Sequence, residues 1–170
     1  MSDCYRDETR KAHGHEWTIQ WCYDTDTGAP WAEHDDHGPV SDWTSASKRP
    51  GEMALNDHRG SRRYYDFQAA VKQAREEGWN TEPYNWPTKG AQAAAAAMAD
   101  FKRLRDWCND EWHWCGVVVT LTEGDNDISA SLWGIESDAS DYFEEVIEDL
   151  MYQCLCDKNR RTYPVTSEGV

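Results

Sequence analysis

The feature that most constrains the fold is the stretch from Glu136 to Leu150, ESDASDYFEEVIEDL, with the residues that follow it. Its apolar side chains recur at the i, i+3, i+4, i+7 spacing of a helix that packs one face on a core. This apolar stripe consists of Phe143, Val146, Ile147, Leu150, Met151 and Cys154. The sequence therefore predicts an amphipathic C-terminal helix that lies on a hydrophobic surface.

The opposite face of this helix carries carboxylates and no cation. It consists of Asp141, Glu144, Glu145, Glu148 and Asp149. Like charges at i,i+4 destabilise a helix by about 0.2–0.5 kcal/mol per pair, and the macrodipole favours acids only near the helix start. At about 1.5 Å per residue the array has roughly one charge per 2.4 Å, the same order as about 1.7 Å in duplex DNA.

The negative charge of the chain is concentrated in its last third. The formal net charge is −15, and residues 106–157 contain fourteen Asp or Glu and no Lys or Arg. Basic runs such as RGSRR and FKRLR precede this region, whereas we expect a salt-adapted protein to be acidic throughout. The charge argues against direct binding to nucleic acid or to an anionic membrane. It favours a basic partner, with an acidic surface that only keeps the chain soluble as the alternative.

Three stretches have the pattern of β-strands. Apolar and polar residues alternate over residues 15–24, HEWTIQWCYD, with the period of two that is typical of a strand. Residues 115–121 form a short apolar run, and residues 128–135 are its expected hairpin partner across a turn with Gly and Asp. Antiparallel pairing of these strands is the simplest arrangement.

Two further helices are expected before the hairpin. Residues 64–79 have helical periodicity with Gly78 as a stop, and residues 90–110 follow a Thr88 cap. The expected inward face of the second helix is Ala94, Ala97, Met98, Phe101, Leu104 and Cys108. We predict a single α+β domain over residues 1–170, in which about three helices pack on an antiparallel sheet of three or four strands.

Two regions of this domain stand out. Residues 24–60, rich in Gly and Pro, predict a long irregular loop with a short strand near the sequence EMAL. Residues 106–157 form a strongly acidic region that contains the hairpin and the C-terminal helix.

The cysteines indicate a reducing environment. The chain has six, with no CxxC pair: Cys4, Cys22, Cys108, Cys115, Cys154 and Cys156. We expect buried free thiols in a cytosol and not disulfides. The start of the chain has no apolar signal-peptide region, and no apolar run reaches the roughly 20 residues of a membrane span.

A histidine-rich segment, EHDDH, offers possible ligands for a divalent metal. The candidates are Glu33, His34, Asp35, Asp36 and His37, with His13 and His15 from the HGH run. Their loop position favours solvated residues, so we expect no metal and no cofactor. Cys108 and His113 are close in sequence, but no nucleophile motif accompanies them, and we do not expect an enzyme.

A tryptophan cluster, WCNDEWHWC, lies between the second helix and the hairpin. Its three tryptophans are Trp107, Trp112 and Trp114. Core packing is the favoured interpretation. The alternative is an exposed patch that serves a homodimer or a partner interface, because Trp is enriched at binding hot spots.

Four stretches resemble small, acidic accessory proteins of tailed bacteriophages and prophages. They are RRYYDFQAAVKQAREEGW, DFKRLRDWCNDEWHWCGVVVTL, SLWGIESDA and HGPVSDW. The resemblance covers about two-thirds of the chain and includes no catalytic motif. It implies expression in the cytoplasm of a host bacterium. By analogy with phage genes of this size, it suggests an inhibitor of host defence, of the anti-CRISPR or anti-restriction type.

The sequence thus predicts an acidic nucleic-acid mimic that blocks the basic DNA- or RNA-binding surface of a host CRISPR effector or restriction enzyme. The expected partner-binding residues are Glu123, Asp125, Asp127, Asp138, Asp141, Glu144, Glu145, Glu148 and Asp149. Two alternatives stay open: a metal-dependent enzyme or regulator that uses the histidine-rich loop, and a structural or self-assembling phage protein.

Overall fold

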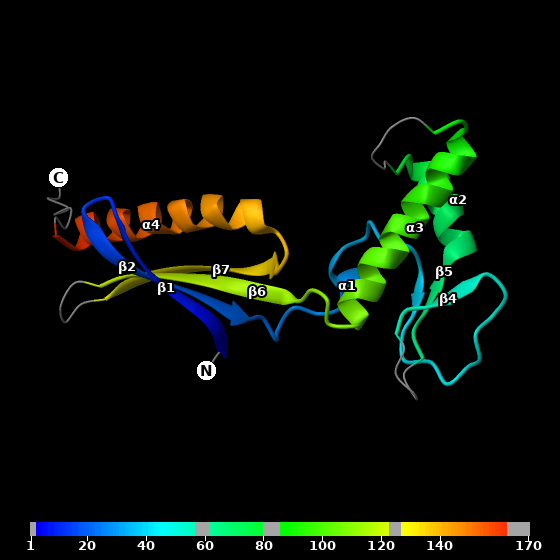
Figure 1. Cartoon of the computed structure of the whole chain (residues 1–170), viewed down its shortest axis with the longest axis horizontal. Helices are drawn as coiled ribbons and strands as arrows, with labels where there is room; N and C mark the ends of the chain where they lie inside the picture. Colours follow the sequence, from blue (N-terminus) through cyan, green and yellow to red (C-terminus); the bar gives the residue numbers. More distant parts are fainter. Residues whose placement is uncertain (1–2, 57–61, 80–85, 123–126, 163–170) are drawn as a thin grey trace, which may run out of the picture. The chain divides into compact units, whose positions relative to one another are not determined.

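The computed structural model describes residues 3–56, 62–79, 86–122 and 127–162 (Figure 1). The chain forms two compact units. Unit 1 comprises Met1–Thr27 and His113–Val170, and unit 2 comprises Gly28–Trp112. Within the described residues there are four helices and two antiparallel sheets, which confirms the predicted α+β class. That residues 1–170 behave as a single domain stays a prediction.

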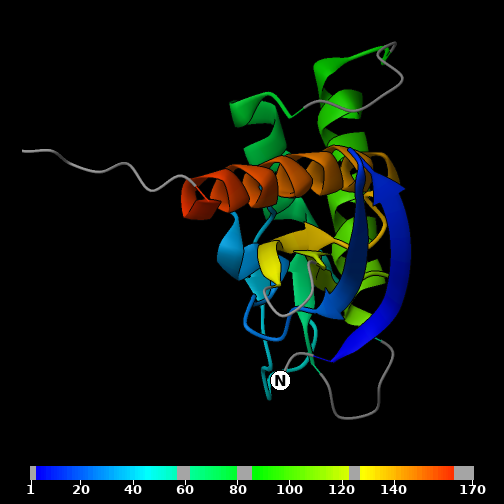
Figure 2. The same cartoon turned by 90° about the vertical axis from the view of Figure 1, so that its left-hand side faces the viewer.

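Unit 1 is a four-stranded antiparallel sheet with one long helix on one face. The strand order is β1 (Cys4–Ala12), β2 (His15–Tyr23), β6 (Trp114–Leu121) and β7 (Ile128–Glu136). Helix α4 (Ser140–Thr162) runs along this sheet, as Figures 1 and 2 show in orange. The three strands predicted from the sequence are β2, β6 and β7, and β1 is an addition.

The hairpin of β1 and β2 turns at His13 and Gly14. Their φ angles of 53° and 77° both lie in the left-handed region, as a two-residue hairpin turn of the type favoured by strand twist requires. The sequence of β1, CYRDETRKA, has six consecutive polar residues, Arg6 to Lys11. No apolar alternation therefore marks it as a strand.

The core of unit 1 lies between the sheet and α4, and it confirms the predicted apolar stripe of the helix. Phe143 is half-buried, and Val146, Ile147, Leu150, Met151 and Cys154 are at most 3% exposed. The sheet contributes Trp17, Ile19, Trp21, Cys115, Val117, Val119, Leu121, Ile128 and Ile135. Burial of apolar surface, worth about 25 cal/mol per Å², holds α4 in place.

Unit 2 contains a small three-stranded antiparallel sheet of order β3 (Val40–Ser41), β5 (Tyr64–Asp66) and β4 (Glu52–Ala54). The structure thus adds a second sheet to the predicted one. The expected loop of residues 24–60 contains β3, β4 and the short helix α1 (Pro30–Glu33), so it is not wholly irregular. Strand β4 is the one expected near EMAL, and residues 57–60 lie outside the described part.

Helices α2 (Phe67–Glu77) and α3 (Lys89–Cys108) lie side by side (Figure 1). Gly78 ends α2 with a φ of 73°, and the Thr88 hydroxyl accepts a hydrogen bond from Ala91 N–H at 3.1 Å, so both predicted boundaries are confirmed. Small side chains allow the two helices to approach closely. The buried alanines are Ala70 and Ala74 of α2 with Ala93, Ala96 and Ala97 of α3.

Two predictions about burial in this region have different outcomes. Met98 was assigned to the inward face of α3 and is 43% exposed, so that assignment is wrong. In an all-alanine run the sequence cannot show which neighbouring positions face the partner helix. Trp112 and Trp114 are 2% and 5% exposed, which confirms core packing for these two tryptophans, and Trp107 is half-buried.

Candidate functional site on the acidic face of helix α4

Most of the negative charge belongs to unit 1. It has 18 Asp or Glu against 6 Lys or Arg, a net charge of −12, whereas unit 2 has 14 against 11, a net charge of −3. The predicted acidic region, residues 106–157, begins in the last turn of α3 and continues through β6, β7 and α4. The charge is therefore concentrated in unit 1.

The structure places seven of the nine predicted partner-binding acids. Glu123 and Asp125 lie outside the described residues. Asp127 is exposed before β7, and Asp138 is exposed in the turn before α4. The acids on α4, all exposed, are Asp141, Glu144, Glu145, Glu148 and Asp149. They divide into two rows with different surroundings.

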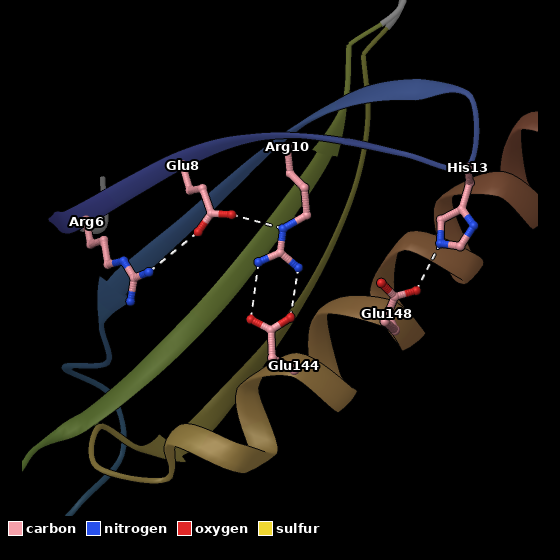
Figure 3. A network of polar contacts seen from close by, with 6 residues as sticks. All are labelled: Arg6, Glu8, Arg10, His13, Glu144 and Glu148. Carbon is pink, nitrogen blue, oxygen red and sulfur yellow. Dashed lines mark hydrogen bonds and ion pairs between the residues drawn. The ribbon is translucent and has the colours of Figure 1, made fainter.

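The first row faces β1, from which Arg10 pairs with Glu144, and the β1–β2 turn. Arg10 lies opposite Trp17 in the β1–β2 register, and so points to the face that α4 covers. Its Nη1 and Nη2 donate to Glu144 Oε2 and Oε1 at 2.8 and 3.2 Å, a bidentate pair (Figure 3). Arg10 Nε also donates to Glu8 at 2.9 Å, and Arg6 Nη2 donates to Glu8 at 3.5 Å.

This pairing changes the titration of both partners. Hydrogen bonds from Arg10 hold the pKa of Glu144 below its usual value, although burial opposes the shift. The hydrogen bond to Glu144 raises the pKa of Arg10, and Glu8 adds to the effect. The Glu144 side chain is 65% exposed, so the pair contributes no more than about 1 kcal/mol to stability. Its main effect is to cancel the charge of Glu144 locally.

Glu148 is the second acid of this row. His13 Nε2, in the β1–β2 turn, lies 2.9 Å from Glu148 Oε2, and Figure 3 shows the ring reaching across to the helix. The contact is an ion pair when His13 is protonated and a hydrogen bond otherwise. The sequence offered His13 as a possible metal ligand, whereas its partner in the structure is an acid of α4.

The second row comprises Asp141, Glu145 and Asp149, which we call the free acidic row. Its members are four residues apart, so neighbours are separated by about 6 Å along one side of the helix. Within the part of the chain that the structure describes, none of the three forms an ion pair or a side-chain hydrogen bond. Asp141, in the first turn, also gains from the helix dipole.

A groove of about 140 Å³ lies between α4 and β7, beside this row. Glu145, Asp149 and Tyr142 line it from α4, and Ser131 and Leu132 line it from β7. Tyr142 is 48% and Leu132 40% exposed. The groove therefore combines apolar surface with two unpaired carboxylates, a composition that fits a side chain with an aliphatic stem and a cationic end.

A β-bulge lies near the C-terminal end of β7. The β6–β7 register shifts so that Trp133 and Gly134 both lie opposite Gly116. Gly134 has a φ of 73°, which favours glycine, and its N–H donates to Asp24 Oδ2 at 2.9 Å. The Trp133 ring lies directly over Gly116, where any Cβ would collide with it. The bulge thus fixes the position of Trp133 at the sheet edge.

Asp24 anchors this bulge from the end of β2. Besides Gly134 N–H, it accepts hydrogen bonds from Asp26 N–H at 3.0 Å, Thr27 N–H at 3.1 Å and the Thr27 hydroxyl at 2.8 Å. Burial alone would raise the pKa of Asp24, but these hydrogen bonds together lower it below its usual value. The carboxylate form is therefore the one that the fold stabilises.

The histidine-rich segment in unit 2 has a structural role around His37. His37 Nδ1 is 2.6 Å from Asp100 Oδ1, and Asp100 Oδ2 accepts from Gly38 N–H at 2.8 Å and from the Tyr65 hydroxyl at 2.7 Å. Burial, with the hydrogen bond to Asp100, raises the pKa of Tyr65, so its hydroxyl keeps its proton. This network ties the segment to α3.

The alternative chemistries expected from the sequence involve possible metal ligands and Cys108. Among the described residues no group of three or more His, Cys, Asp or Glu side chains is placed to hold a metal ion. The thiol of Cys108 lies 3.8 Å from Arg63 Nη1, and burial raises its pKa despite that cation. A thiol with a raised pKa is a poor nucleophile.

The cysteine prediction is wrong for one pair. A disulfide joins Cys4 to Cys22, whereas Cys108, Cys115, Cys154 and Cys156 are free thiols as expected. Cys4 and Cys22 face each other in the β1–β2 register, 18 residues apart in sequence. Because the sequence does not mark β1 as a strand, it could not indicate that these two residues meet.

Sequence reasoning missed the cations that pair with α4 and the apolar side chains of the groove. The signal for the cations is His13-Gly14, a two-residue turn that places a polar strand beside β2. Leu132 and Tyr142 carry no separate signal, because single exposed apolar residues are common on protein surfaces.

No helix in the described ranges is both long and apolar enough to cross a lipid bilayer. Comparisons of the chain with protein-family models, with curated proteins and with solved structures found no match. The function must therefore be inferred from the residues of the chain itself.

Proposed function

We propose that the chain is a bacteriophage-encoded inhibitor that binds a basic nucleic-acid-binding protein of host defence, a CRISPR effector or a restriction enzyme. The observation that carries the proposal is the free acidic row. Asp141, Glu145 and Asp149 are exposed and unpaired within the described residues, on a unit of net charge −12. In the neighbouring row Arg10 pairs with Glu144 and His13 contacts Glu148, but the free acidic row has no such partners among the described residues. Uncompensated like charges destabilise a helix unless another molecule neutralises them.

The phage origin and the host cytoplasm rest on the sequence resemblance alone. The Cys4–Cys22 disulfide weighs against the cytoplasm, because disulfides are rare where glutathione and thioredoxin keep thiols reduced. The acidic surface does not depend on this bond, since α4 carries the free acidic row.

The surface is a partial mimic of nucleic acid. All five acids of α4 together would approach the charge density of a duplex, but Arg10 compensates Glu144, and His13 compensates Glu148 when its ring is protonated. The free acidic row has about one charge per 6 Å, against about one per 3.4 Å along a single DNA strand. We therefore expect charge to steer the encounter, and Tyr142 and Leu132 to add affinity and specificity.

The test is capture of partners from bacterial lysate by tagged protein, at about 0.15 M salt, where the Debye length is roughly 8 Å. The wild-type chain should retain a nuclease, CRISPR or restriction subunit. The triple variant Asp141→Lys, Glu145→Lys, Asp149→Lys should not, because it turns the attractive surface into a repulsive one. Excess duplex DNA should release the captured protein.

A matched control separates this surface from overall charge. Asp35, Glu76 and Glu111 are exposed acids of unit 2, and their reversal to Lys changes the net charge of the chain by the same amount. This control should capture the partner as the wild type does. Equal capture by the α4 variant, with its fold verified by circular dichroism, would overturn the proposed function.

A further inference from the structure

The two edges of the unit 1 sheet differ in charge. Strand β1, CYRDETRKA, has five charged residues in nine, whereas β7, ISASLWGIE, has one, at its last position, and no proline. Edge strands expose unpaired N–H and C=O groups, and charged side chains normally protect them from pairing with other chains. The β1 edge has this protection and the β7 edge lacks it.

The β7 edge is also open and apolar. Among the described residues no strand pairs with its outer side. Leu132 and Trp133 are 40% and 39% exposed, with Ser129 and Ser131 exposed beside them. Leu132 lines the groove under α4, and the Trp133 ring covers Gly116 on the other face of the sheet. An added strand would thus meet apolar side chains on both of its faces.

We propose that β7 is a docking edge that accepts an extended cationic segment of the partner as an additional strand. This inference rests on the proposed function and names its mode of binding. Main-chain hydrogen bonds to β7 supply affinity, and alternate side chains supply specificity. Lys or Arg side chains of the segment enter the groove, where their aliphatic stems contact Leu132 and Tyr142 and their cationic ends pair with Glu145 and Asp149. The apolar side chains that alternate with them lie on the opposite face of the sheet, the face of Trp133.

Charge selects this occupant over a second copy of the chain. In a two-fold dimer the same surface patch lies on both sides of the interface. Antiparallel pairing of β7 with itself would bring together two copies of a unit with net charge −12, each with Glu145 and Asp149 beside the seam. Like charges across an interface disfavour association, whereas a cationic strand compensates them.

The test uses three nine-residue peptides on the full-length protein, with binding measured by titration calorimetry. The first alternates Val with Lys. The second has the same sequence with alternate backbone nitrogens methylated, which removes hydrogen-bond donors and retains the charge. The third replaces Lys by Glu. The Val-Lys peptide should bind, methylation should weaken it by about tenfold or more, and the Val-Glu peptide should not bind.

Two further measurements locate the site. Amide hydrogen exchange of residues 128–135 should slow on addition of the Val-Lys peptide. Leu132→Lys, which places a cation in the groove, should weaken binding by about tenfold or more. Met98→Lys is the matched control, because Met98 is 43% exposed and lies on α3 of unit 2. It should leave binding unchanged.

The outcomes separate this inference from the proposed function. Equal binding of the methylated peptide, unchanged exchange in β7, or no binding of the Val-Lys peptide would overturn strand docking and leave the lysate experiment to decide the function. A doubled mass in light scattering that Leu132→Lys abolishes would identify a second copy as the occupant, and would also overturn it. If the peptide docks on β7 but no protein is captured from lysate in a charge-dependent way, β7 is supported as a docking edge. The same result would count against a host-defence protein as the partner.

Discussion

At the scale of single residues, Arg10 decides how much of the acidic face of α4 carries uncompensated charge. Its guanidinium holds Glu144 in a bidentate pair and Glu8 through Nε. Arg10→Gln keeps part of the aliphatic stem and removes the charge. We expect the free energy of unfolding, measured in urea, to fall by about 0.5–1 kcal/mol, because the pair is half exposed. The same change leaves Glu144 uncompensated, so a cationic peptide should bind more tightly at low salt.

Lys72→Gln is the control for this substitution. Lys72 and Glu76 form an i,i+4 pair on α2 at 3.9 Å, with both side chains more than 60% exposed. Such a pair contributes about 0.2–0.5 kcal/mol at most. If Arg10→Gln costs no more than this control and leaves peptide binding unchanged, Glu144 was never shielded, and the division of α4 into two rows is incorrect.

At the scale of elements, the bulge in β7 depends on a carboxylate at the end of β2. The pKa of Asp24 is lowered in the folded state, against about 3.9 in an unfolded chain. A carboxylate with a lowered pKa stabilises the folded state when the pH is above the pKa of the unfolded chain. This stabilisation is lost as the pH falls through the pKa of the folded state. We expect Asp24→Asn to be less stable than wild type by about 1–2 kcal/mol at pH 7, with a smaller difference at pH 3.

Denaturant midpoints at pH 7, 5, 4 and 3 measure this effect. Asp26→Asn is the control, because Asp26 is an exposed carboxylate in the same turn whose backbone N–H, not its side chain, bonds Asp24. A constant difference between wild type and Asp24→Asn across this range would show that the charge of Asp24 does not hold the bulge.

The elements also show what the sequence can predict. Apolar periodicity identified α4 with its buried stripe, β2, α2 and α3. The helix expected from residue 64 begins at Phe67, because Tyr64–Asp66 forms β5. An apolar run identified β6, and the turn after it identified β7 as its hairpin partner. The sequence did not identify β1, in which Arg6 to Lys11 are all polar. Everything that depends on β1 was therefore missed: the Cys4–Cys22 disulfide, the Arg10–Glu144 pair and the His13–Glu148 contact. The sequence showed five acids on one helix face, but only the fold shows which of them are compensated.

At the scale of the whole molecule, net charge is divided very unevenly between two units of similar size. Unit 1 has an excess of twelve negative charges and contains the acidic helix, the protected β1 edge and the unprotected β7 edge. Electrostatic repulsion is thus concentrated in the unit that carries the proposed binding surface. A surface that attracts a basic partner also repels itself, so the free chain should be less stable than the bound one.

This repulsion predicts how the free chain responds to salt. Between 0.01 and 0.15 M NaCl the Debye length falls from about 30 to about 8 Å, which screens the repulsion within unit 1. The same salt weakens the Arg10–Glu144 pair, but that pair contributes at most about 1 kcal/mol. We expect the thermal midpoint to rise by about 2–4 °C for each 1 kcal/mol of repulsion removed.

The variant with Asp141, Glu145 and Asp149 changed to Lys should show a smaller rise, because reversing these charges removes much of the repulsion. A thermal midpoint that falls with salt would mean that ion pairs stabilise the free chain more than repulsion destabilises it. The free acidic row would then not destabilise the free chain.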